Sequence, residues 1–510
     1  MKAFRWIASG AIATAALIAG PVAASAGAPA PATPARTADP LAAFDHQHVT
    51  WHQCQTGPDD GDGQLLDEAG AQCADIRVPL DYTHPRGRTI TIAISRLAAT
   101  DTAHKIGPLI INTGGPALPN LTTVALAGPA MGATGARFDL IGMDQRFSGR
   151  STPVDCGWPQ GWLTHSAGAD RASFERMVRL AHDLATLCAA HSDLLGFAST
   201  ANAARDMDVI RAALGAPKLS YLGYSYGSYL GALYTQLFPQ HADRVVLDSA
   251  IDPAHVGIDK GHVAPVREAA LADWAAWAAA HDDQVHLGTT AAQVLATVDR
   301  VYRAAARHPL HVGEFLVDDT IVATLLLDPL TDDGEDSNAQ LASRVQVLAT
   351  AAGTGSAAAT DDLTGALTGL LTGANSAIQT GQVATMCGDA AVPDDPNAYY
   401  RNVQADRAVA PIFGPIDGNI SPCAFWSTRP AAPITVHNGV PALIAHADGD
   451  INAISALNDA MHAALTGSRM ITLRGVRAHG VYLFEGSPCV DDTVNAYLTT
   501  GHLPVTDLTC

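Results

Sequence analysis

The chain has 510 residues, of which 48% are hydrophobic and only 16% are charged, so it can bury a large core. Its 30 Lys and Arg residues are outnumbered by 50 Asp and Glu residues, which gives a formal charge of −20. This balance argues against nucleic acid and anionic membranes as partners, because both require a basic surface.

The N-terminus has the features of a targeting segment. Lys2 and Arg5 supply positive charge, residues 6–24 are almost all apolar or small, and Ala24-Ser-Ala26 resembles a signal-peptidase site. We therefore expect a signal peptide at 1–26 and a secreted, extracellular protein. A membrane anchor is the weaker interpretation, because glycines and a proline interrupt the apolar run. A Pro/Ala-rich leader without periodicity, 27–40, is expected to be disordered.

Cysteine usage agrees with export. The eight cysteines are Cys54, Cys73, Cys156, Cys188, Cys387, Cys423, Cys489 and Cys510. None forms a CxxC pair and no histidine lies at zinc-ligand spacing, so neither a metal nor another cofactor is expected. Pairing sequence neighbours predicts the disulfides 54–73, 156–188, 387–423 and 489–510, although the sequence alone permits about 105 connectivities.

Short apolar runs alternate with helical stretches in the first part of the mature chain, 41–253. The expected strands are 108–112, 138–142, 219–223 and 245–248, and the expected helices are 203–214 and 228–238. Buried strands that alternate with helices are typical of βαβ units and a mostly parallel sheet.

The pattern changes at 254–430, where Ala-rich helical stretches predominate, and the strand pattern returns at 431–510. In this last part we expect strands at 441–445 and 468–473, a helix at 455–465 between them, and a closing helix at 490–498. The prediction is an α/β core with a mainly helical cap inserted before the last core strands.

The strongest chemical signal is Gly223-Tyr-Ser225-Tyr-Gly227, which follows an apolar strand and enters a helix. A serine flanked at ±2 by glycines in this context predicts the nucleophile elbow of an α/β hydrolase. Larger residues at either glycine would collide with the neighbouring strand or helix. An ordinary strand-to-helix turn with an incidental serine is the alternative, which the strand and helix on either side disfavour.

Two later loops supply the expected partners of Ser225. In this fold the chain order is serine, then acid, then histidine, each after a core strand. His479, followed by a glycine, has the topological position of the base. Asp448 and Asp450 both follow the strand at 441–445 and compete for the acid, with spacing slightly favouring Asp450. The histidine would take the serine proton, and the carboxylate would hold the imidazole tautomer.

An oxyanion hole requires two backbone N–H donors. The first is expected from Tyr226, directly after the nucleophile, and the second from the Gly-rich turn Thr113-Gly-Gly-Pro116 after an early strand. Because proline has no N–H, Gly115 is the expected donor in that turn. The alternative is a plain Gly-Gly-Pro loop.

Several segments resemble the secreted tripeptidyl aminopeptidases of actinobacteria, which are relatives of the prolyl aminopeptidases. The resembling stretches are Cys73-Ala-Asp-Ile-Arg-Val-Pro-Leu-Asp-Tyr82, Phe138 to Arg146, Gly149 to Cys156, Thr200 to Gly215, the elbow, Pro441 to Asp450, His479-Gly480, Cys489-Val490 and Tyr497-Leu498. The resemblance implies that the acid is Asp450, that the insertion caps the active site, and that the substrate is a peptide with a free N-terminus.

The chain also departs from this family. The family's Asn-Pro-Gly-Gly-Pro-Gly loop reads Asn112-Thr-Gly-Gly-Pro-Ala117 here, and its Asp-Pro-Arg-Gly-x-Gly reads Asp144-Gln-Arg-Phe-Ser-Gly149. The usual residues after the acid are replaced by Ile451-Asn-Ala-Ile454. Leu118 and Phe147 are expected to narrow or reshape the acyl pocket.

Capture of a peptide's ammonium requires carboxylates at the closed end of the pocket. The candidates in the cap are Asp332, Asp333, Glu335, Asp336 and Asp389, and the sequence selects none of them. The favoured function is a secreted serine aminopeptidase. The alternatives are an esterase or amidase for a small metabolite and a binding protein without turnover.

Overall fold

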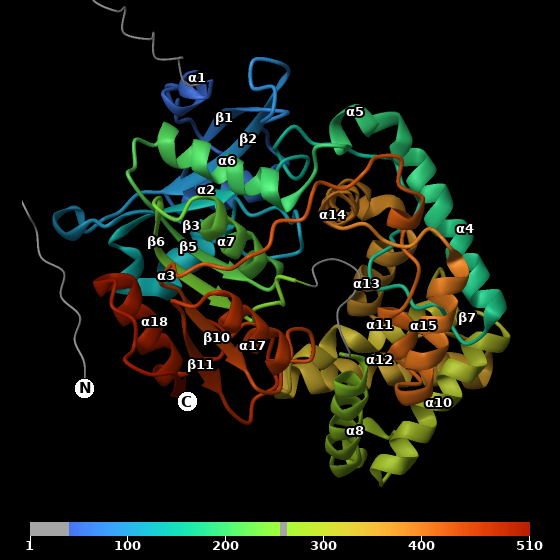
Figure 1. Cartoon of the computed structure of the whole chain (residues 1–510). Coiled ribbons are helices and arrows are strands. Elements are labelled where there is room, and N and C mark those ends of the chain that lie inside the picture. Colours follow the sequence, from blue (N-terminus) through green and yellow to red (C-terminus); the bar gives the residue numbers. More distant parts are fainter. Residues whose placement is uncertain (1–39, 255–262) are drawn as a thin grey trace, which may run out of the picture. The chain divides into compact units, whose positions relative to one another are not determined.

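A nine-stranded sheet organises the α/β core (Figure 1). The computed structural model describes residues 40–254 and 263–510, so the predicted signal peptide, 1–26, and all of the predicted leader except Pro40 lie outside the described residues. The strand order is β1-β2-β4-β3-β5-β6-β10-β11-β12. The strands β1 and β2 run antiparallel to their neighbours and the others are parallel, which confirms the predicted α/β-hydrolase class with a mostly parallel sheet.

The predicted core strands are all present, with ends shifted by up to three residues. The strands of the sheet are β1 (Gln72–Pro79), β2 (Thr89–Leu97), β3 (Gly107–Asn112), β4 (Phe138–Met143), β5 (Leu219–Tyr224), β6 (Ala242–Asp248), β10 (Leu443–Ala447), β11 (Arg469–Leu473) and β12 (Leu508–Thr509). Their central residues are apolar on both faces because helices cover both sides of the sheet.

Two layers of helices cover the sheet. The helices α2 (Gly61–Glu68), α3 (Thr123–Gly135) and α18 (Pro488–Thr500) lie on one face. The helices α1 (Ala42–Asp45), α6 (Thr200–Ala213), α7 (Tyr226–Leu237) and α17 (Ser455–Ala464) lie on the other. Alternate residues of β3 serve the two sides, with Leu109 and Ile111 in the first core and Ile110 in the second.

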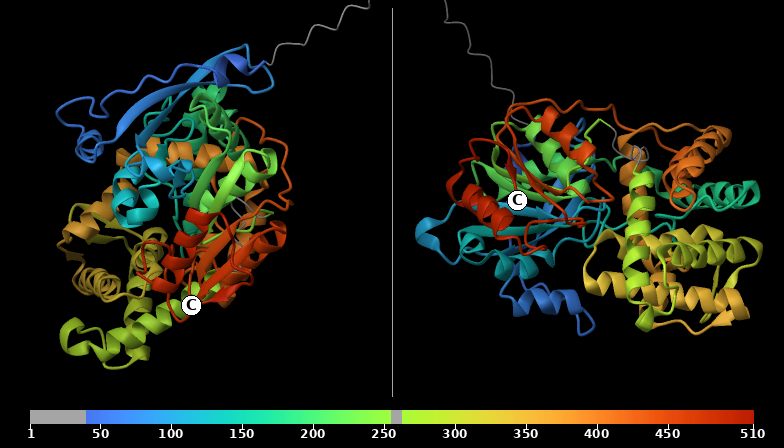
Figure 2. Two further views of the ribbon diagram at one scale, coloured as in Figure 1. Left: turned by 90° about the vertical axis from the view of Figure 1, so that its left-hand side faces the viewer. Right: turned by 90° about the horizontal axis from the view of Figure 1, so that it is seen from below.

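The segment between β6 and β10 forms a mainly helical region with its own apolar core. Its helices are α8 (Ala264–Ala280), α9 (Asp282–Val285), α10 (Ala291–Arg307), α11 (Asp319–Leu327), α12 (Glu335–Thr354), α13 (Asp361–Leu371), α14 (Ser376–Asp389), α15 (Pro396–Val409) and α16 (Gly414–Asp417). A small sheet of β7 (Leu310–Val312), β8 (Phe315–Val317) and β9 (Ser356–Ala357) was not predicted. We call this region the cap, and Figure 2 shows it beside the core. No helix within the described residues is long and apolar enough to cross a membrane.

A second helical segment, which leaves the core between β4 and α6, packs against the cap. It contains α4 (Arg171–Cys188) and α5 (Ser192–Leu195), and α4 packs against α15 and the short 3-10 helix η5 (Pro422–Phe425) of the cap (Figure 1). The predicted domain boundaries at 254 and 430 stay a prediction, because helix α4, which lies outside them, packs against helices that lie inside them.

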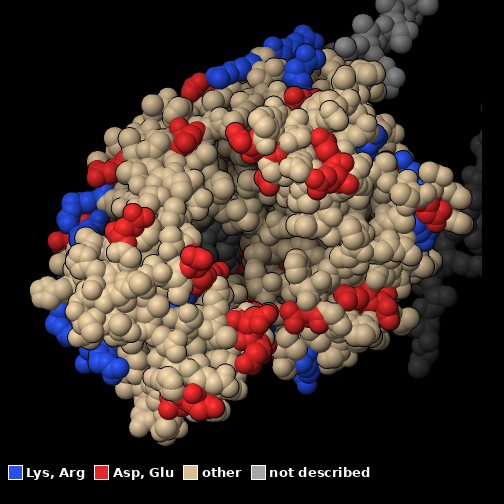
Figure 3. Space-filling model, turned by 180° about the vertical axis from the view of Figure 1, so that it is seen from behind, with Lys and Arg blue, Asp and Glu red and all other residues tan. Residues whose placement is uncertain are grey.

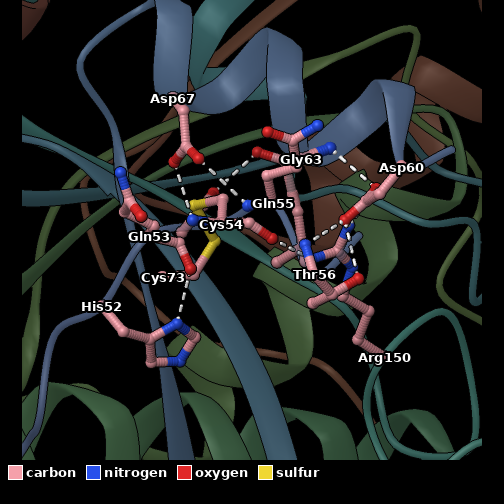
Figure 4. The surroundings of a disulfide bond; sticks show 12 residues. His52, Gln53, Cys54, Gln55, Thr56, Asp60, Gly63, Asp67, Cys73 and Arg150 are labelled. Carbon is pink, nitrogen blue, oxygen red and sulfur yellow. Dashed lines mark hydrogen bonds and ion pairs between the residues drawn. A yellow bond between two sulfur atoms is a disulfide. The ribbon is translucent and has the colours of Figure 1, made fainter. Parts of the chain in front are cut away.

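Four disulfides join the pairs Cys54–Cys73, Cys156–Cys188, Cys387–Cys423 and Cys489–Cys510, which are the pairs of sequence neighbours. Around Cys54–Cys73, Asp67 accepts a 2.7 Å hydrogen bond from the Cys54 backbone, and Arg150 binds Asp60 at 2.7 Å (Figure 4). Arg150 immediately follows the 144–149 loop, so the N-terminal segment is fastened to that loop.

Candidate active site

The turn at Ser225 has the geometry of a nucleophile elbow. Ser225 lies between β5 and α7 with φ 54° and ψ −124°, a conformation that strains a residue with a side chain. A Cβ on Gly223 would lie 2.4 Å from the Gly227 carbonyl oxygen, and one on Gly227 would lie 2.7 Å from the Asn112 carbonyl oxygen. The two glycines are therefore required by close backbone contacts on both sides of the serine.

The Gly-rich turn after β3 lies against this elbow. A Cβ on Gly114 would come within 3.1 Å of the Ser225 Cβ and 3.4 Å of the Tyr226 backbone nitrogen. One on Gly115 would lie 2.7 Å from the Leu118 side chain and 3.4 Å from the Gln382 amide nitrogen. The turn thus brings the predicted donor loop beside the predicted donor Tyr226, with Leu118 next to Gly115.

Two departures from the family pattern contact each other. Gln145 accepts a 2.6 Å hydrogen bond from the Ala117 backbone N–H, and Ser148 donates a 2.5 Å bond to the Ala117 carbonyl. Ala117 and Phe147 have φ of 49° and 68°, values that favour glycine. The 144–149 loop therefore holds both backbone groups of Ala117 and keeps the altered turn in place without a glycine.

Asp450 and His479 are brought together after β10 and β11. His479 Nδ1 lies 2.8 Å from Asp450 Oδ2, while Asp450 Oδ1 accepts the backbone N–H groups of Asn452 and Ala453. Burial alone would raise the pKa of Asp450, but its hydrogen bond to His479, the His479 charge and the two backbone bonds lower the pKa below its usual value. The carboxylate is therefore ionised and oriented toward the imidazole.

The competing carboxylate, Asp448, does not face His479. It is exposed, and its Oδ1 accepts a 2.8 Å hydrogen bond from the Gly475 backbone N–H. This contact joins the loops after β10 and β11 but leaves the imidazole to Asp450.

Sequence reasoning missed Asp248, the buried last residue of β6, which connects the elbow to the histidine loop. Its backbone carbonyl accepts the Ser225 N–H at 2.9 Å, and its carboxylate accepts the N–H groups of Val481 and Tyr482. Burial raises the pKa of Asp248 to about 7, although these bonds and the His479 charge favour ionisation. The only signal was a carboxylate at the C-terminal end of a core strand.

Four of the five candidates for an ammonium site lie in one run at the start of α12, and the fifth, Asp389, lies apart from them. In that run Asp333 accepts the Arg477 backbone N–H and Glu335 accepts the Trp277 indole N–H, with Asp332 and Asp336 in the same stretch. Asp389 instead accepts hydrogen bonds from the backbone and hydroxyl of Thr200 at the start of α6, and burial raises its pKa to about 7. The structure does not gather the five into one site.

The surface seen from behind is hollowed near its centre (Figure 3). Asp and Glu side chains lie around this hollow, whereas Lys and Arg lie mostly toward the periphery of the view. A negative rim raises the local concentration of cationic solutes, which agrees with the overall charge of −20.

Comparison with known proteins gives consistent results. Residues 107–451 match the family described as alpha/beta hydrolase fold, and residues 411–510 match the family described as TAP-like protein. The tripeptidyl aminopeptidase of Streptomyces lividans is 32% identical over 458 residues, covering 86% of this chain and 83% of that protein. The serine protease Hip1 of Mycobacterium tuberculosis is 27% identical over 521 residues, 91% of each chain. Carboxylesterase B of the same organism is 30% identical over 478 residues, 86% of each chain.

Proposed function

Because this chain belongs to the TAP-like family of α/β hydrolases and is a serine hydrolase, we propose that it is an exopeptidase that releases short peptides from free N-termini. The observation that carries the proposal is the contact between the buried Asp450 carboxylate and the partly exposed His479, together with the strained elbow at Ser225. The 32% identity to a tripeptidyl aminopeptidase supports the substrate class.

The chemistry of the proposal uses an acyl-enzyme intermediate. Ser225 Oγ attacks the scissile carbonyl carbon, and His479 accepts the hydroxyl proton and donates it to the leaving amine. Asp450 keeps the proton on His479 Nδ1 and stabilises the imidazolium. The backbone N–H groups of Tyr226 and Gly115 donate to the oxyanion of the tetrahedral intermediate. Water then releases the peptide by the reverse sequence.

Export is the second part of the proposal. Four disulfides are typical of proteins that fold in an oxidising compartment, and the N-terminal 26 residues have the pattern of a signal peptide. We infer that the mature enzyme acts outside the cell, where its substrates are extracellular peptides.

An esterase is the second candidate, and one observation favours it. The Leu118 side chain lies next to Gly115, the glycine that would donate to the oxyanion. The turn is therefore bulkier than in the family pattern. A relative with 30% identity over most of the chain is named Carboxylesterase B. A narrowed acyl pocket would favour small esters over peptides.

The test is a paired rate measurement on the mature protein. A tripeptide anilide with a free amine is compared with its N-acetylated twin and with a p-nitrophenyl ester, with Ser225→Ala as the control. Cleavage of the free-amine anilide alone, lost in Ser225→Ala, is the expected result. Cleavage of the ester by the wild type without either anilide would refute the exopeptidase and leave the esterase.

A further inference from the structure

A small cavity between the cap and the segment that precedes α4 has an unusual set of unpaired polar atoms. It measures about 90 Å³, and its walls include Trp162, His165, Arg267, Asp417 and Asn419. Four buried atoms on three of these side chains have no hydrogen-bond partner within the described residues: both ring nitrogens of His165, Asp417 Oδ2 and Asn419 Oδ1. Leaving buried polar atoms unpaired is unfavourable, so the cluster suits a polar ligand.

The unpaired atoms are mainly acceptors. Asn419 Nδ2 donates 2.9 Å to the His165 carbonyl, which fixes Oδ1 as the free end of that amide. Burial lowers the pKa of His165 to about 4, so the ring is neutral near pH 7 and keeps one acceptor nitrogen. The Leu370 carbonyl favours the charged ring but forms no hydrogen bond of normal geometry with it. The ligand must therefore supply several donors.

The charges around the cavity favour a cation. Arg267 is the positive group in the wall, and its guanidinium already donates to Asp417 Oδ1 at 2.5 Å, to Asn452 Oδ1 and to the Ile451 carbonyl. Outside the wall, Asp318 also acts on His165, and its charge is paired with Arg176 at 3.1 Å. An anionic ligand would face Asp417 Oδ2, whereas a cation would find three acceptors: Asp417 Oδ2, Asn419 Oδ1 and one nitrogen of His165.

Two links connect this cavity with the candidate active site. Arg267 ties Asp417 to Ile451 and Asn452, the residues directly after Asp450. On the other side, Met386 lines the cavity four residues after Gln382, whose amide lies beside Gly115. Four residues of helix span about 6 Å and return to nearly the same face, so Met386 and Gln382 share one side of α14. The cavity and the Gly-rich turn therefore both border this side of α14.

We propose that the cavity formed by His165, Asp417 and Asn419 binds the protonated N-terminal amine of the substrate. This inference rests on the proposed exopeptidase function. An ammonium has three donors, which match Asp417 Oδ2, Asn419 Oδ1 and one nitrogen of His165. The pocket then excludes N-blocked chains, because an acylated amine has lost its charge and two of its donors.

The test measures kcat/KM for the free-amine tripeptide anilide and for its N-acetylated twin in matched variants. His165→Phe removes the ring nitrogens and keeps the Arg267–Asp417 pair, and Asp417→Asn removes the charge. We expect the preference for the free amine to fall about 10-fold in His165→Phe and about 30-fold or more in Asp417→Asn, through the free-amine substrate alone. The control is Asp361→Asn, which makes the same charge change at an exposed position of the cap. This variant should keep the wild-type preference for the free-amine substrate.

The outcomes separate the two proposals. If the wild type cleaves the free-amine and N-acetylated anilides equally well, or cleaves neither, the exopeptidase proposal is refuted and with it the proposed role of the cavity. A wild type that prefers the free amine, with the same preference in both variants, overturns the cavity assignment alone and leaves water as its occupant. An equal loss on both substrates also overturns it, because that result indicates a structural role. If Asp417→Asn does not fold, His165→Phe decides.

Discussion

Two buried polar clusters in this protein differ in how fully they are paired. In the core, Asp450 and Asp248 each accept at least two backbone N–H groups as well as a side-chain partner. In the cavity between the cap and the segment that precedes α4, the lining residues His165, Asp417 and Asn419 have four side-chain atoms without a hydrogen-bond partner within the described residues. A fully paired cluster fixes geometry, whereas an incompletely paired one is suited to exchange a ligand.

The largest expected effect lies in the core cluster. Asp450→Asn should lower kcat by about 10⁴-fold, because an amide stabilises the wrong imidazole tautomer and not the imidazolium. The matched control is Asp448→Asn, two residues earlier and exposed, which should stay within a few-fold of the wild type. Steady-state rates on a p-nitrophenyl ester would check both. Equal losses in the two variants would mean that the acid assignment is wrong.

The sequence was sufficient to propose the residues of the core site because their signals are local. Gly223, Ser225 and Gly227 lie within five residues, between a recognisable strand and helix, and His479 follows the next-to-last strand of the sheet. The geometry at Ser225 and the Asp450–His479 contact agree with that interpretation. Asp448 and Asp450 could not be separated by spacing alone, since their difference lies in which carboxylate is buried.

The cavity cluster of His165, Asp417 and Asn419 could not be predicted in the same way. His165 and Asn419 are 254 positions apart in the chain, in two different segments that leave the core, and only the tertiary fold brings them together. Helical periodicity indicates which residues are apolar but not which distant polar residues will share a cavity. The small sheet of the cap was missed as well, because strands of two or three residues carry too little periodicity. The strands β1 and β2 were also missed, although with eight and nine residues they are the longest of the large sheet.

The buried Arg146–Asp206 pair in the core allows the contribution of a fully paired cluster to the free energy of unfolding to be measured. Arg146 binds Asp206 through two bonds of 2.6 and 2.8 Å, with 1% and 0% of the two side chains exposed. Asp206→Asn leaves the guanidinium buried without a counter-charge, and we expect a loss of about 3–5 kcal/mol in the free energy of unfolding. Asp193→Asn, which breaks the exposed Arg88 pair, should cause no measurable change. Urea denaturation measures both.

Asp389 is an intermediate case. Its carboxyl group is hydrogen-bonded to Thr200, but the effect of burial on its pKa is larger than the effect of these bonds. The folded protein holds the Asp389 proton up to about pH 7, whereas the unfolded chain releases it near the ordinary value of 3.8. This contribution to stability is full below that value and is lost as the pH rises toward 7, with a slope of up to about 1.4 kcal/mol per pH unit. Asp389→Asn should flatten the dependence between pH 4 and 7, measured by urea denaturation. A slope unchanged from wild type would show that Asp389 ionises normally.

The smallest expected effect lies in the cavity cluster of His165, Asp417 and Asn419. Because the ring nitrogens of His165 have no partner within the described residues, His165→Phe should change the free energy of unfolding by less than about 0.5 kcal/mol, or raise it. The matched control is Asn458→Leu, since the buried Asn458 amide accepts from Ala250 and donates to Ala453. There we expect a loss of about 1–3 kcal/mol. If His165→Phe lowers the free energy of unfolding as much as Asn458→Leu does, His165 is already hydrogen-bonded in the free protein. The contrast between the two clusters then does not hold.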